Sequence, residues 1–320
     1  MRNHFLGRRY AWIVVLASTF CAAQTGTKNG SPALSAAGSC LQRSIPISVL
    51  RNDNNLELQL SLMRVNVEGQ SASTVLLERQ NISPRVVLLL DVSGSMGRFS
   101  GTEWANGVNA AELALEAFPQ QSQVALVTFG DGVRLSAFDT RSAVDQKLIA
   151  LKNMKPRGRT ALYTAVEQSL KVFGAAQFGD TIFIVSDAED DAGPTNPKTL
   201  SNELTQRGIR AFAFLMVDPN EGPARDRHQE IPIFGEFVKS TGGSVWVLGP
   251  NMKWPDGKEN SVMIRTMQNQ IGWPYRLDIA LAASPTKPAK LQIATTMKGV
   301  ELAYPQHIEA CWSPTPATNP

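Results

Sequence analysis

VVLLLDVSGSM, residues 86–96, joins a run of five apolar residues to a short polar loop. A continuous apolar run of this length is typical of a strand that is buried on both faces of a parallel sheet. In the loop, Asp91, Ser93 and Ser95 place one carboxylate and two hydroxyls on alternate residues. Gly94 permits the tight turn between the two serines. Because ligands of open parallel sheets bind beyond the carboxyl ends of the strands, this stretch predicts a binding site.

The central region of the chain repeats the alternation of buried strand and helix. Further apolar runs cover residues 124–129, 181–185, 209–217 and 244–248, and helix candidates cover residues 104–118, 143–154, 161–173, 198–207 and 233–240. The alternation predicts an α/β fold with a doubly wound, mostly parallel sheet. The turn at residues 130–132 precedes another short apolar run, residues 133–138, which predicts a hairpin and one antiparallel edge strand.

Strand-like stretches on both sides of this region predict a flanking β layer. The alternating stretches are residues 47–49, 56–60, 275–282 and 291–296, with a turn at residues 52–55. The predicted organisation is a signal peptide (1–23), a disordered linker (24–39), an N-terminal β segment (40–83), the α/β domain (84–272), a C-terminal β segment (273–311) that packs with the first one, and a disordered tail (312–320).

The first 23 residues have the layout of a secretory signal. A basic start, an apolar run over residues 10–17 and small residues at 21–23 follow one another. We therefore expect an exported protein, either periplasmic or secreted. An uncleaved membrane anchor is the alternative, and Phe20 disfavours a lipid on Cys21.

Two cysteines remain if Cys21 leaves with the signal. Cys40 precedes the expected folded region and Cys311 follows it. In an oxidising compartment a Cys40–Cys311 disulfide would tie the two ends together, and two free thiols are the alternative.

Composition and charge exclude several classes of protein. A chain of 320 residues that is 43% hydrophobic and 18% charged can bury a sizeable core and is too apolar for a disordered chain. After the first two dozen residues no apolar run reaches membrane-spanning length, so we expect no membrane span in the mature chain. Outside residues 1–23 the chain carries 28 basic and 28 acidic residues, so its charge gives no reason to expect nucleic-acid binding.

Motifs of the common enzyme classes are missing from the sequence. The chain has three histidines, no Gly-x-x-x-x-Gly-Lys phosphate loop, no Cys-x-x-Cys and no His-x-x-x-His. No serine lies in a nucleophile elbow. We therefore expect a protein that is not an enzyme, with no catalytic residues.

The donor atoms of the loop after residue 90 suit a hard cation. Asp91, Ser93 and Ser95 offer oxygen only, which favours Mg²⁺ before Ca²⁺ or Mn²⁺ and does not fit a structural zinc site. The alternative is that these residues only cap the helix that follows, because Ser and Asp are common at helix starts.

The Asp-x-Ser-x-Ser sequence at the end of an apolar strand resembles the metal-ion-dependent adhesion site of von Willebrand factor A-type domains, as found in secreted bacterial proteins. Members of that family have a threonine far downstream and an aspartate at the end of a later buried strand. Here Thr160 opens a helical stretch, and Asp187 ends the strand-like residues 181–187. The resemblance covers roughly residues 84–248, and Ala188 stands where many members have glycine.

The resemblance implies a metal-ligand set and a role for each residue. Ser93, Ser95 and Thr160 would contact the metal through their hydroxyls. Asp91 and Asp187 would hold the metal mainly through water molecules.

Other polar residues near this edge of the predicted sheet are weaker candidates. The acidic residues 189–191 form either a solvated loop before a helix or a second cation site. The charged residues 218–228 follow another strand, so they either contribute to partner choice or form a variable surface insertion. Arg98 and Phe99 could frame a contact surface, whereas the helical spacing of Trp104 favours the core.

These features together predict an extracytoplasmic module for protein binding, adhesion or scaffolding. Neutral hydroxyls around Mg²⁺ leave the ion electrophilic, so a carboxylate of an Asp or Glu on another protein is the natural further ligand. The alternatives are a Mg²⁺-dependent hydrolase and a structural secreted domain without a working metal site.

Overall fold

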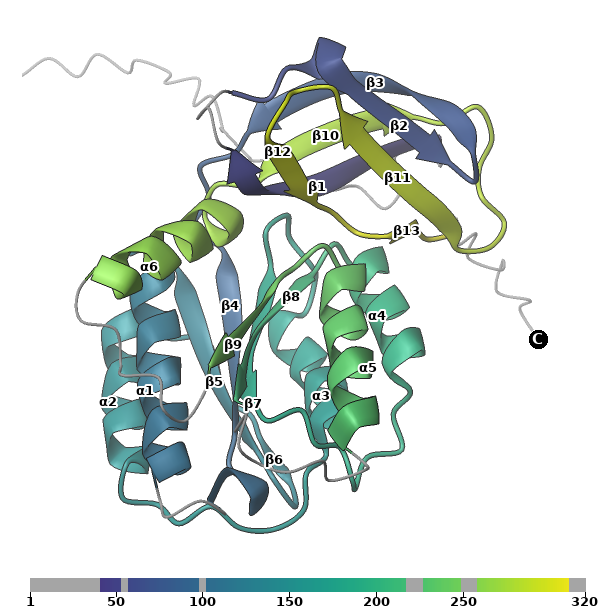
Figure 1. The fold of residues 1–320 in the computed structure, drawn as a ribbon. Helices are drawn as coiled ribbons and strands as arrows, with labels where there is room; N and C mark the ends of the chain where they lie inside the picture. The colour runs from purple at the N-terminus through teal and green to yellow at the C-terminus, as the bar shows by residue number, and fades with distance from the viewer. Residues whose placement is uncertain (1–40, 53–56, 98–101, 217–226, 249–257, 311–320) are drawn as a thin grey trace, which may run out of the picture. The chain divides into compact units, whose positions relative to one another are not determined.

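The structure, a computed structural model, describes residues 41–52, 57–97, 102–216, 227–248 and 258–310. Its strands form one six-stranded and one seven-stranded sheet (Figure 1). The predicted signal, linker, tail and three cysteines lie outside the described residues. In the part of the chain that is described, no helix combines the length and apolar character that a membrane span requires.

The six-stranded sheet has the order β6-β5-β4-β7-β8-β9. β4, β5, β7, β8 and β9 run parallel, and β6 is an antiparallel edge strand. The bounds are β4 (Arg85–Asp91), β5 (Gln123–Phe129), β6 (Val133–Arg134), β7 (Thr181–Ser186), β8 (Arg210–Met216) and β9 (Val245–Leu248). These elements confirm the predicted α/β class and the hairpin, although β6 is shorter than the predicted run.

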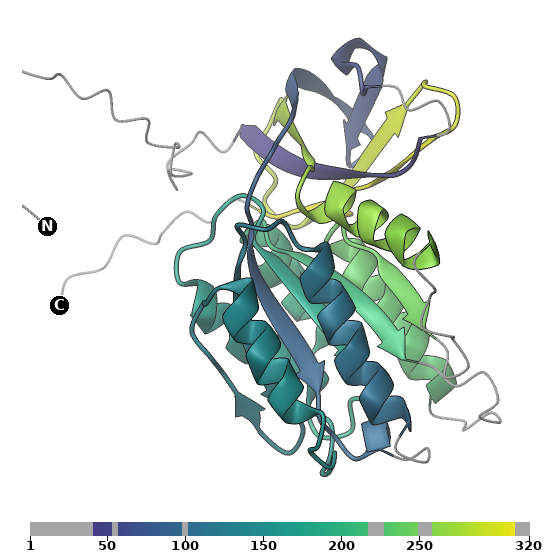
Figure 2. The same ribbon diagram turned by 90° about the vertical axis from the view of Figure 1, so that its left-hand side faces the viewer.

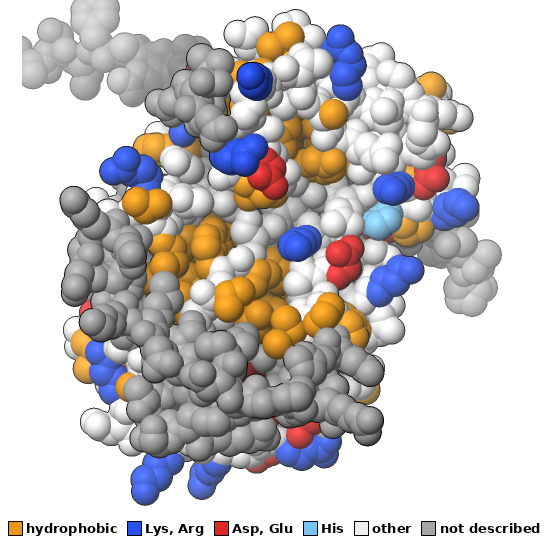
Figure 3. Space-filling model, in the orientation of Figure 1, with side chains coloured by type: hydrophobic (Ala, Val, Ile, Leu, Met, Phe, Trp, Pro, Cys, Tyr) orange, Lys and Arg blue, Asp and Glu red, His pale blue; other side chains and the backbone are white. Residues whose placement is uncertain are grey.

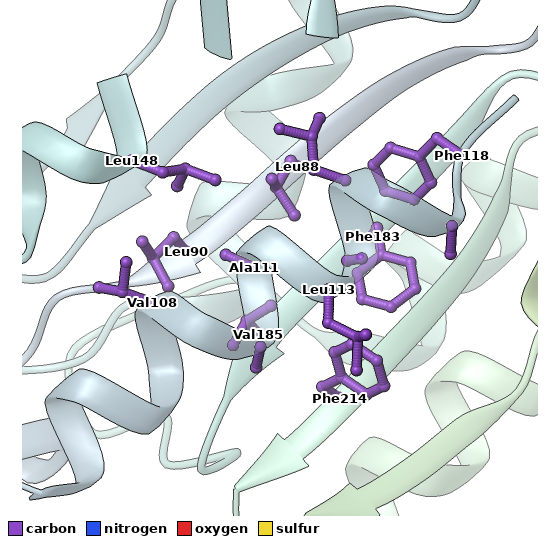
Figure 4. Close-up of a cluster of buried hydrophobic side chains, with 14 of the residues drawn as sticks. Leu88, Leu90, Val108, Ala111, Leu113, Phe118, Leu148, Phe183, Val185 and Phe214 are labelled. Carbon is purple, nitrogen blue, oxygen red and sulfur yellow. The ribbon is translucent and has the colours of Figure 1, made fainter. Parts of the chain in front are cut away.

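Helices cover both faces of this sheet (Figures 1 and 2). They are α1 (Thr102–Ala117), α2 (Arg141–Leu151), α3 (Leu162–Phe173), α4 (Pro197–Gln206), α5 (Arg227–Ser240) and α6 (Lys258–Ile271). Leu88 and Leu90 of β4 pack with α1, α2 and α6, as Figure 4 shows for part of this cluster. Val87 and Leu89 point to the opposite face and pack with α3, α4 and α5.

Complete burial of both faces explains why β4 reads as an unbroken apolar run. All five residues from Val86 to Leu90 have no exposed surface. Burial of a side chain of this size contributes about 1.5–3 kcal/mol, so the apolar run fixes β4 at the centre of the sheet. The polar loop that follows is thereby held at the carboxyl edge of the sheet.

The segments that differ from the sequence prediction include α6 and residues 56–60. α6 was not predicted, although Ile264, Met267 and Ile271 have helical spacing and the latter two are fully buried. The strand predicted over residues 56–60 is wrong, because residues 57–59 have no regular structure and Leu60–Leu62 form the 3-10 turn η1. No neighbouring strand pairs with this segment, so its alternating leucines do not form a strand.

The seven-stranded sheet combines strands from both sides of the α/β region, in the order β12-β1-β10-β3-β2-β11-β13. Their bounds are β1 (Gln42–Asn52), β2 (Met63–Val67), β3 (Gln70–Arg79), β10 (Tyr275–Ala280), β11 (Ala289–Thr295), β12 (Val300–Ala303) and β13 (His307–Ile308). β10 pairs with β1 on one side and with β3 on the other. Buried residues alternate along β10 and β11, as expected for a sheet with one face on its core.

The chain passes between the two sheets at residues 80–84 and again at residues 272–274. These passages are hydrogen-bonded to each other, because the N–H of Gln80 donates to Pro274 O at 2.8 Å and that of Ile82 to Gly272 O at 3.1 Å. The ends of the α/β region therefore lie side by side.

A buried arginine joins β8 to β1 and to the end of α6. Arg210 is 1% exposed, and its Nη1 donates to Ser48 Oγ at 2.7 Å and to Gln270 O at 2.8 Å. Its Nη2 donates to Ile271 O at 3.5 Å. Burial lowers the pKa of Arg210 to about 10, and the partial negative charge of the α6 carboxyl end favours its charged form.

Replacement of this arginine tests the junction. We expect Arg210→Met to reduce the free energy of unfolding by about 3 kcal/mol, because Ser48 Oγ and Ile271 O lose the guanidinium as donor and Gln270 O retains only the hydrogen bond from Ser48 Oγ. Guanidinium-induced unfolding followed by tryptophan fluorescence measures the change. The control is Arg207→Met, since Arg207 forms an exposed pair with Glu203, and we expect a loss of about 0.5 kcal/mol or less. Equal midpoints for the two variants would contradict this account of the junction.

Candidate metal centre

Asp91, Ser93 and Ser95 form one buried polar cluster at the carboxyl end of β4. Asp91 is the last residue of β4, and Ser95 begins the 3-10 turn η2 (Ser95–Gly97). The exposed fractions of Asp91, Ser93 and Ser95 are 0%, 0% and 4%. Asp91 Oδ1 accepts a hydrogen bond from the N–H of Ser93 at 2.9 Å, and Ser93 Oγ lies 2.9 Å from Ser95 Oγ. The turn thus brings two hydroxyls together beside the carboxylate.

The second oxygen of Asp91 is held by a residue that the sequence analysis missed. Ser186 Oγ donates to Asp91 Oδ2 at 2.6 Å and accepts a hydrogen bond from the N–H of Ala188 at 3.0 Å. Ser186 ends β7, and the parallel register pairs Leu90 with Val185, so Ser186 lies directly opposite Asp91. That register was the signal that could have identified Ser186.

Asp187 follows Ser186 and is also largely buried, with 8% exposure. Its Oδ1 accepts a hydrogen bond from the N–H of Glu189 at 3.2 Å. Ala188 has a φ of 68°, in the left-handed region that favours glycine. The loop therefore adopts at Ala188 the conformation for which glycine is suited, so the alanine does not change its course.

The loop before α3 is fastened to the loop after β4. Gly94 N–H donates to Gly158 O at 2.9 Å, and Arg157 N–H donates to Val92 O at 3.0 Å. A Cβ atom on Gly94 would lie 3.1 Å from Gly158 O, so glycine allows this close approach. The pairing brings Thr160, which is 2% exposed, to the same edge of the sheet.

The acidic residues after Asp187 bind the backbone of the Thr160 loop. Asp191 Oδ1 accepts a hydrogen bond from the N–H of Thr160 at 2.7 Å, and Thr160 O accepts from the N–H of Asp191 at 3.0 Å. Asp190 accepts from the N–H groups of Leu162 and Tyr163, and partial burial raises its pKa to about 6. Asp191 is exposed, as the prediction of a solvated acidic loop requires, and Asp190 is partly buried, but both also stabilise the start of α3.

The remaining sequence candidates give a mixed result. Trp104 is 4% exposed and its Nε1 donates to Leu151 O at 3.2 Å, which confirms the prediction that it belongs to the core. Arg98, Phe99 and residues 218–226 of the charged segment lie outside the described residues.

The electrostatics of the cluster fit a bound cation. Burial, and then the negative charge of Asp187, raise the pKa of Asp91 to about 7, whereas hydrogen bonds from Ser186 and Ser93 act in the opposite direction. Two buried carboxylates that raise each other's cost of ionisation are stabilised by a divalent ion between them. The donors are carboxylate and hydroxyl oxygens, the type that Mg²⁺ and Ca²⁺ prefer. In the described part of the chain, no group of three or more His, Cys, Asp or Glu side chains is placed to hold a metal.

Comparison with known proteins identifies the class of this domain. The sequence model of the von Willebrand factor type A domain matches residues 86–189, a span that begins in β4 and ends just beyond Asp187. The chain therefore contains a von Willebrand factor A-type domain. No curated protein matches the chain in sequence.

Solved structures with similarity to the chain include three of different origin. The von Willebrand factor type A protein of Catenulispora acidiphila is 12% identical, with a TM-score of 0.44 and coverage of 85% of this chain and 74% of that one. The protein BatB of Bacteroides thetaiotaomicron is 15% identical, with a TM-score of 0.44 and coverage of 58% and 98%. Proximal thread matrix protein 1 of the mussel byssus, solved with a zinc-occupied MIDAS motif, is 15% identical, with a TM-score of 0.46 and coverage of 62% and 49%.

The pKa of Asp91 leads to a pH-dependent stability. Between its ordinary value of 3.8 and about 7, folded Asp91 retains a proton that the unfolded chain has released. Stability conferred by this proton is present at low pH and is lost as the pH rises through about 7. In the presence of a chelator, we expect the melting temperature to fall by a few degrees between about pH 5 and about pH 7.5.

Differential scanning calorimetry of two variants tests whether Asp91 causes this pH dependence. Asp91→Asn should reduce the slope, because asparagine has no proton to release, and Asp190, whose pKa is raised to about 6, accounts for part of the slope that remains. Asp139→Asn is the matched control, since the hydrogen bond from Lys147 lowers the pKa of the exposed Asp139, and its titration falls below this range. Equal slopes for the wild type and Asp91→Asn would contradict the assignment.

Proposed function

We propose that this protein is an extracytoplasmic protein-binding module that grips an acidic group of a partner through a bound Mg²⁺. Domains of the von Willebrand factor A type are protein-interaction modules in general. The observation that carries the finer proposal is the buried cluster of Asp91, Ser93 and Ser95, fastened to the Thr160 loop and adjacent to Asp187.

The proposed ligand set divides into hydroxyls and carboxylates. Ser93, Ser95 and Thr160 would contact Mg²⁺ through their hydroxyls. Asp91 and Asp187 would hold it mainly through water, consistent with the hydrogen bonds that already occupy both oxygens of Asp91. Ca²⁺ or Mn²⁺ satisfies the same oxygen donors.

The choice of donors supports an acidic partner. The proposed direct ligands are neutral hydroxyls, and the two nearby carboxylates act mainly through water. The ion therefore stays electrophilic. A further anionic oxygen from the Asp or Glu of another protein therefore binds favourably at this edge of the sheet. We propose that the bound ion serves adhesion and that the cluster performs no catalysis, because both of its carboxylates are engaged in holding the metal.

The site of action follows from the first 23 residues. A basic start, an apolar run and small residues support export of the mature chain to the periplasm or the medium. We propose the disulfide between Cys40 and Cys311 for the same compartment.

Loss of the metal ligands tests the proposal. We expect Mg²⁺ to raise the melting temperature of the wild type, because an ion that binds only the folded state stabilises it. Asp91→Ala or Ser93→Ala should abolish this rise and leave the fold intact by circular dichroism. The control is Ser73→Ala, which removes an exposed hydroxyl on β3.

Affinity capture from the producing cell, with Mg²⁺ or with a chelator, tests the partner. We expect the wild type and Ser73→Ala to retain a protein in Mg²⁺ only, and Asp91→Ala to retain none in either buffer. A wild-type protein with no Mg²⁺-induced rise and no divalent-dependent capture would refute the proposed function.

Ser186 provides a finer test, since it orients Asp91 without being a proposed ligand. We expect Ser186→Ala to weaken Mg²⁺ binding about tenfold, because Asp91 Oδ2 and the N–H of Ala188 lose their common partner. Isothermal titration with Mg²⁺ measures the dissociation constant, with Ser201→Ala on α4 as a buried-serine control. If Ser186→Ala bound Mg²⁺ as tightly as the wild type, the positioning role of Ser186 would be wrong.

A further inference from the structure

A cavity of about 580 Å³ lies where the seven-stranded sheet meets α5 and β9. One wall comes from β12 and β1, a second from β11 and β13, and a third from Lys239 and residues 243–245. Residues 243–245 lead into β9, so they lie at the amino end of a parallel strand. The metal cluster lies at the carboxyl ends of these strands, and the cavity is therefore a separate site.

The cavity opens along a strand edge that has no backbone partner among the described residues. Within the described residues, β12 is the end strand of its sheet and pairs with β1 alone, through residues 300–303. β11 pairs with β13 through Ala289 and Lys290, and Leu291 N–H donates to Gln306 O at 2.8 Å. Figure 1 shows β11 and β12 on the same side of the molecule. An extended chain that lay along β12 would pair with the N–H and C=O groups on the edge away from β1 and bury Leu302.

The charged side chains that line the cavity indicate which kind of chain would bind there. Lys239, Lys290 and His307 line the cavity together with a single carboxylate, Glu301. The side chains of Lys239 and Lys290 are exposed, and neither is paired with a carboxylate of the described residues. In Figure 3, basic, acidic and histidine side chains gather beside an apolar area on this face of the molecule. The basic excess favours an acidic occupant.

Residues 1–52 and 311–320 do not fit this requirement. Residues 1–52 contain no Asp or Glu, and residues 311–320 contain none and have three prolines. Proline cannot donate a hydrogen bond to a neighbouring strand, so the C-terminal segment is unsuited to pairing along β12. Neither segment offers the acidic side chains that Lys239 and Lys290 favour.

We propose that this cavity binds an extended acidic peptide segment of another protein, which adds a strand to β12 and places carboxylates near Lys239 and Lys290. The backbone edge of β12 supplies affinity that does not depend on sequence, and the two lysines supply the preference for acidic side chains. Binding does not involve the metal cluster.

Fluorescence anisotropy with two labelled ten-residue peptides tests the proposal. One peptide alternates Val with Glu and the other alternates Val with Lys. We expect the wild type to bind the first peptide and to bind the second at least about tenfold more weakly. Lys239→Glu combined with Lys290→Glu should weaken binding of the Val-Glu peptide by about tenfold, and the matched control, Lys171→Glu combined with Lys198→Glu, should not. Equal binding of both peptides, or equal binding by both double variants, would overturn the proposal.

Two further measurements locate the binding. Hydrogen–deuterium exchange should show protection of residues 300–303 when the Val-Glu peptide is added, and protection confined to any other strand would overturn the pairing with β12. Binding should persist in a chelator and in Asp91→Ala. Its loss under either condition would place the peptide at the metal cluster and overturn a separate site.

Discussion

Asp91 ends the central strand of a parallel sheet with its carboxylate fully buried, and neutral groups donate the hydrogen bonds that hold it. Such a group is costly to ionise, and the nearby Asp187 increases that cost. The surrounding loops are arranged around this constraint. The loop after β4 carries the two hydroxyls, and the loop after β7 carries Asp187. The Gly94–Gly158 hydrogen bond holds the loop with Thr160 at the same edge of the sheet. In the function proposed here, a divalent cation would relieve this electrostatic cost, so the arrangement that strains the metal-free domain would give a bound ion its affinity.

The parts of the fold that follow from local pattern could be predicted from the sequence. The apolar run before Asp91 predicted a strand buried on both faces, because burial on both faces requires five consecutive apolar side chains. The candidate ligands Asp91, Ser93 and Ser95 share one loop, so their proximity also follows from local sequence. The positions of Thr160 and Asp187 came from resemblance to a family, because no local pattern relates residues so far apart.

The features that the sequence did not predict depend on tertiary register. Ser186 holds Asp91 only because β7 lies next to β4 in a particular register. Asp190 and Asp191 look like a solvated acidic loop until the backbone of residues 160–163 is placed beside them. Arg210 would be expected on the surface by its charge, yet the end of α6 and Ser48 supply acceptors for it in the interior. Each of these roles needs a partner distant in sequence.

The insertion of the α/β region between β3 and β10 determines the order in which the protein can be completed during synthesis. β10 is the strand that separates β1 from β3, but the ribosome makes it only after the whole inserted region. Until then the apolar faces of β1 and β3 lack their central neighbour and are open to aggregation. If the inserted region folds first, the hydrogen bonds between residues 80–82 and 272–274 position the newly synthesised β10 beside β3. Early folding of the inserted domain would therefore act as an internal chaperone for the flanking sheet.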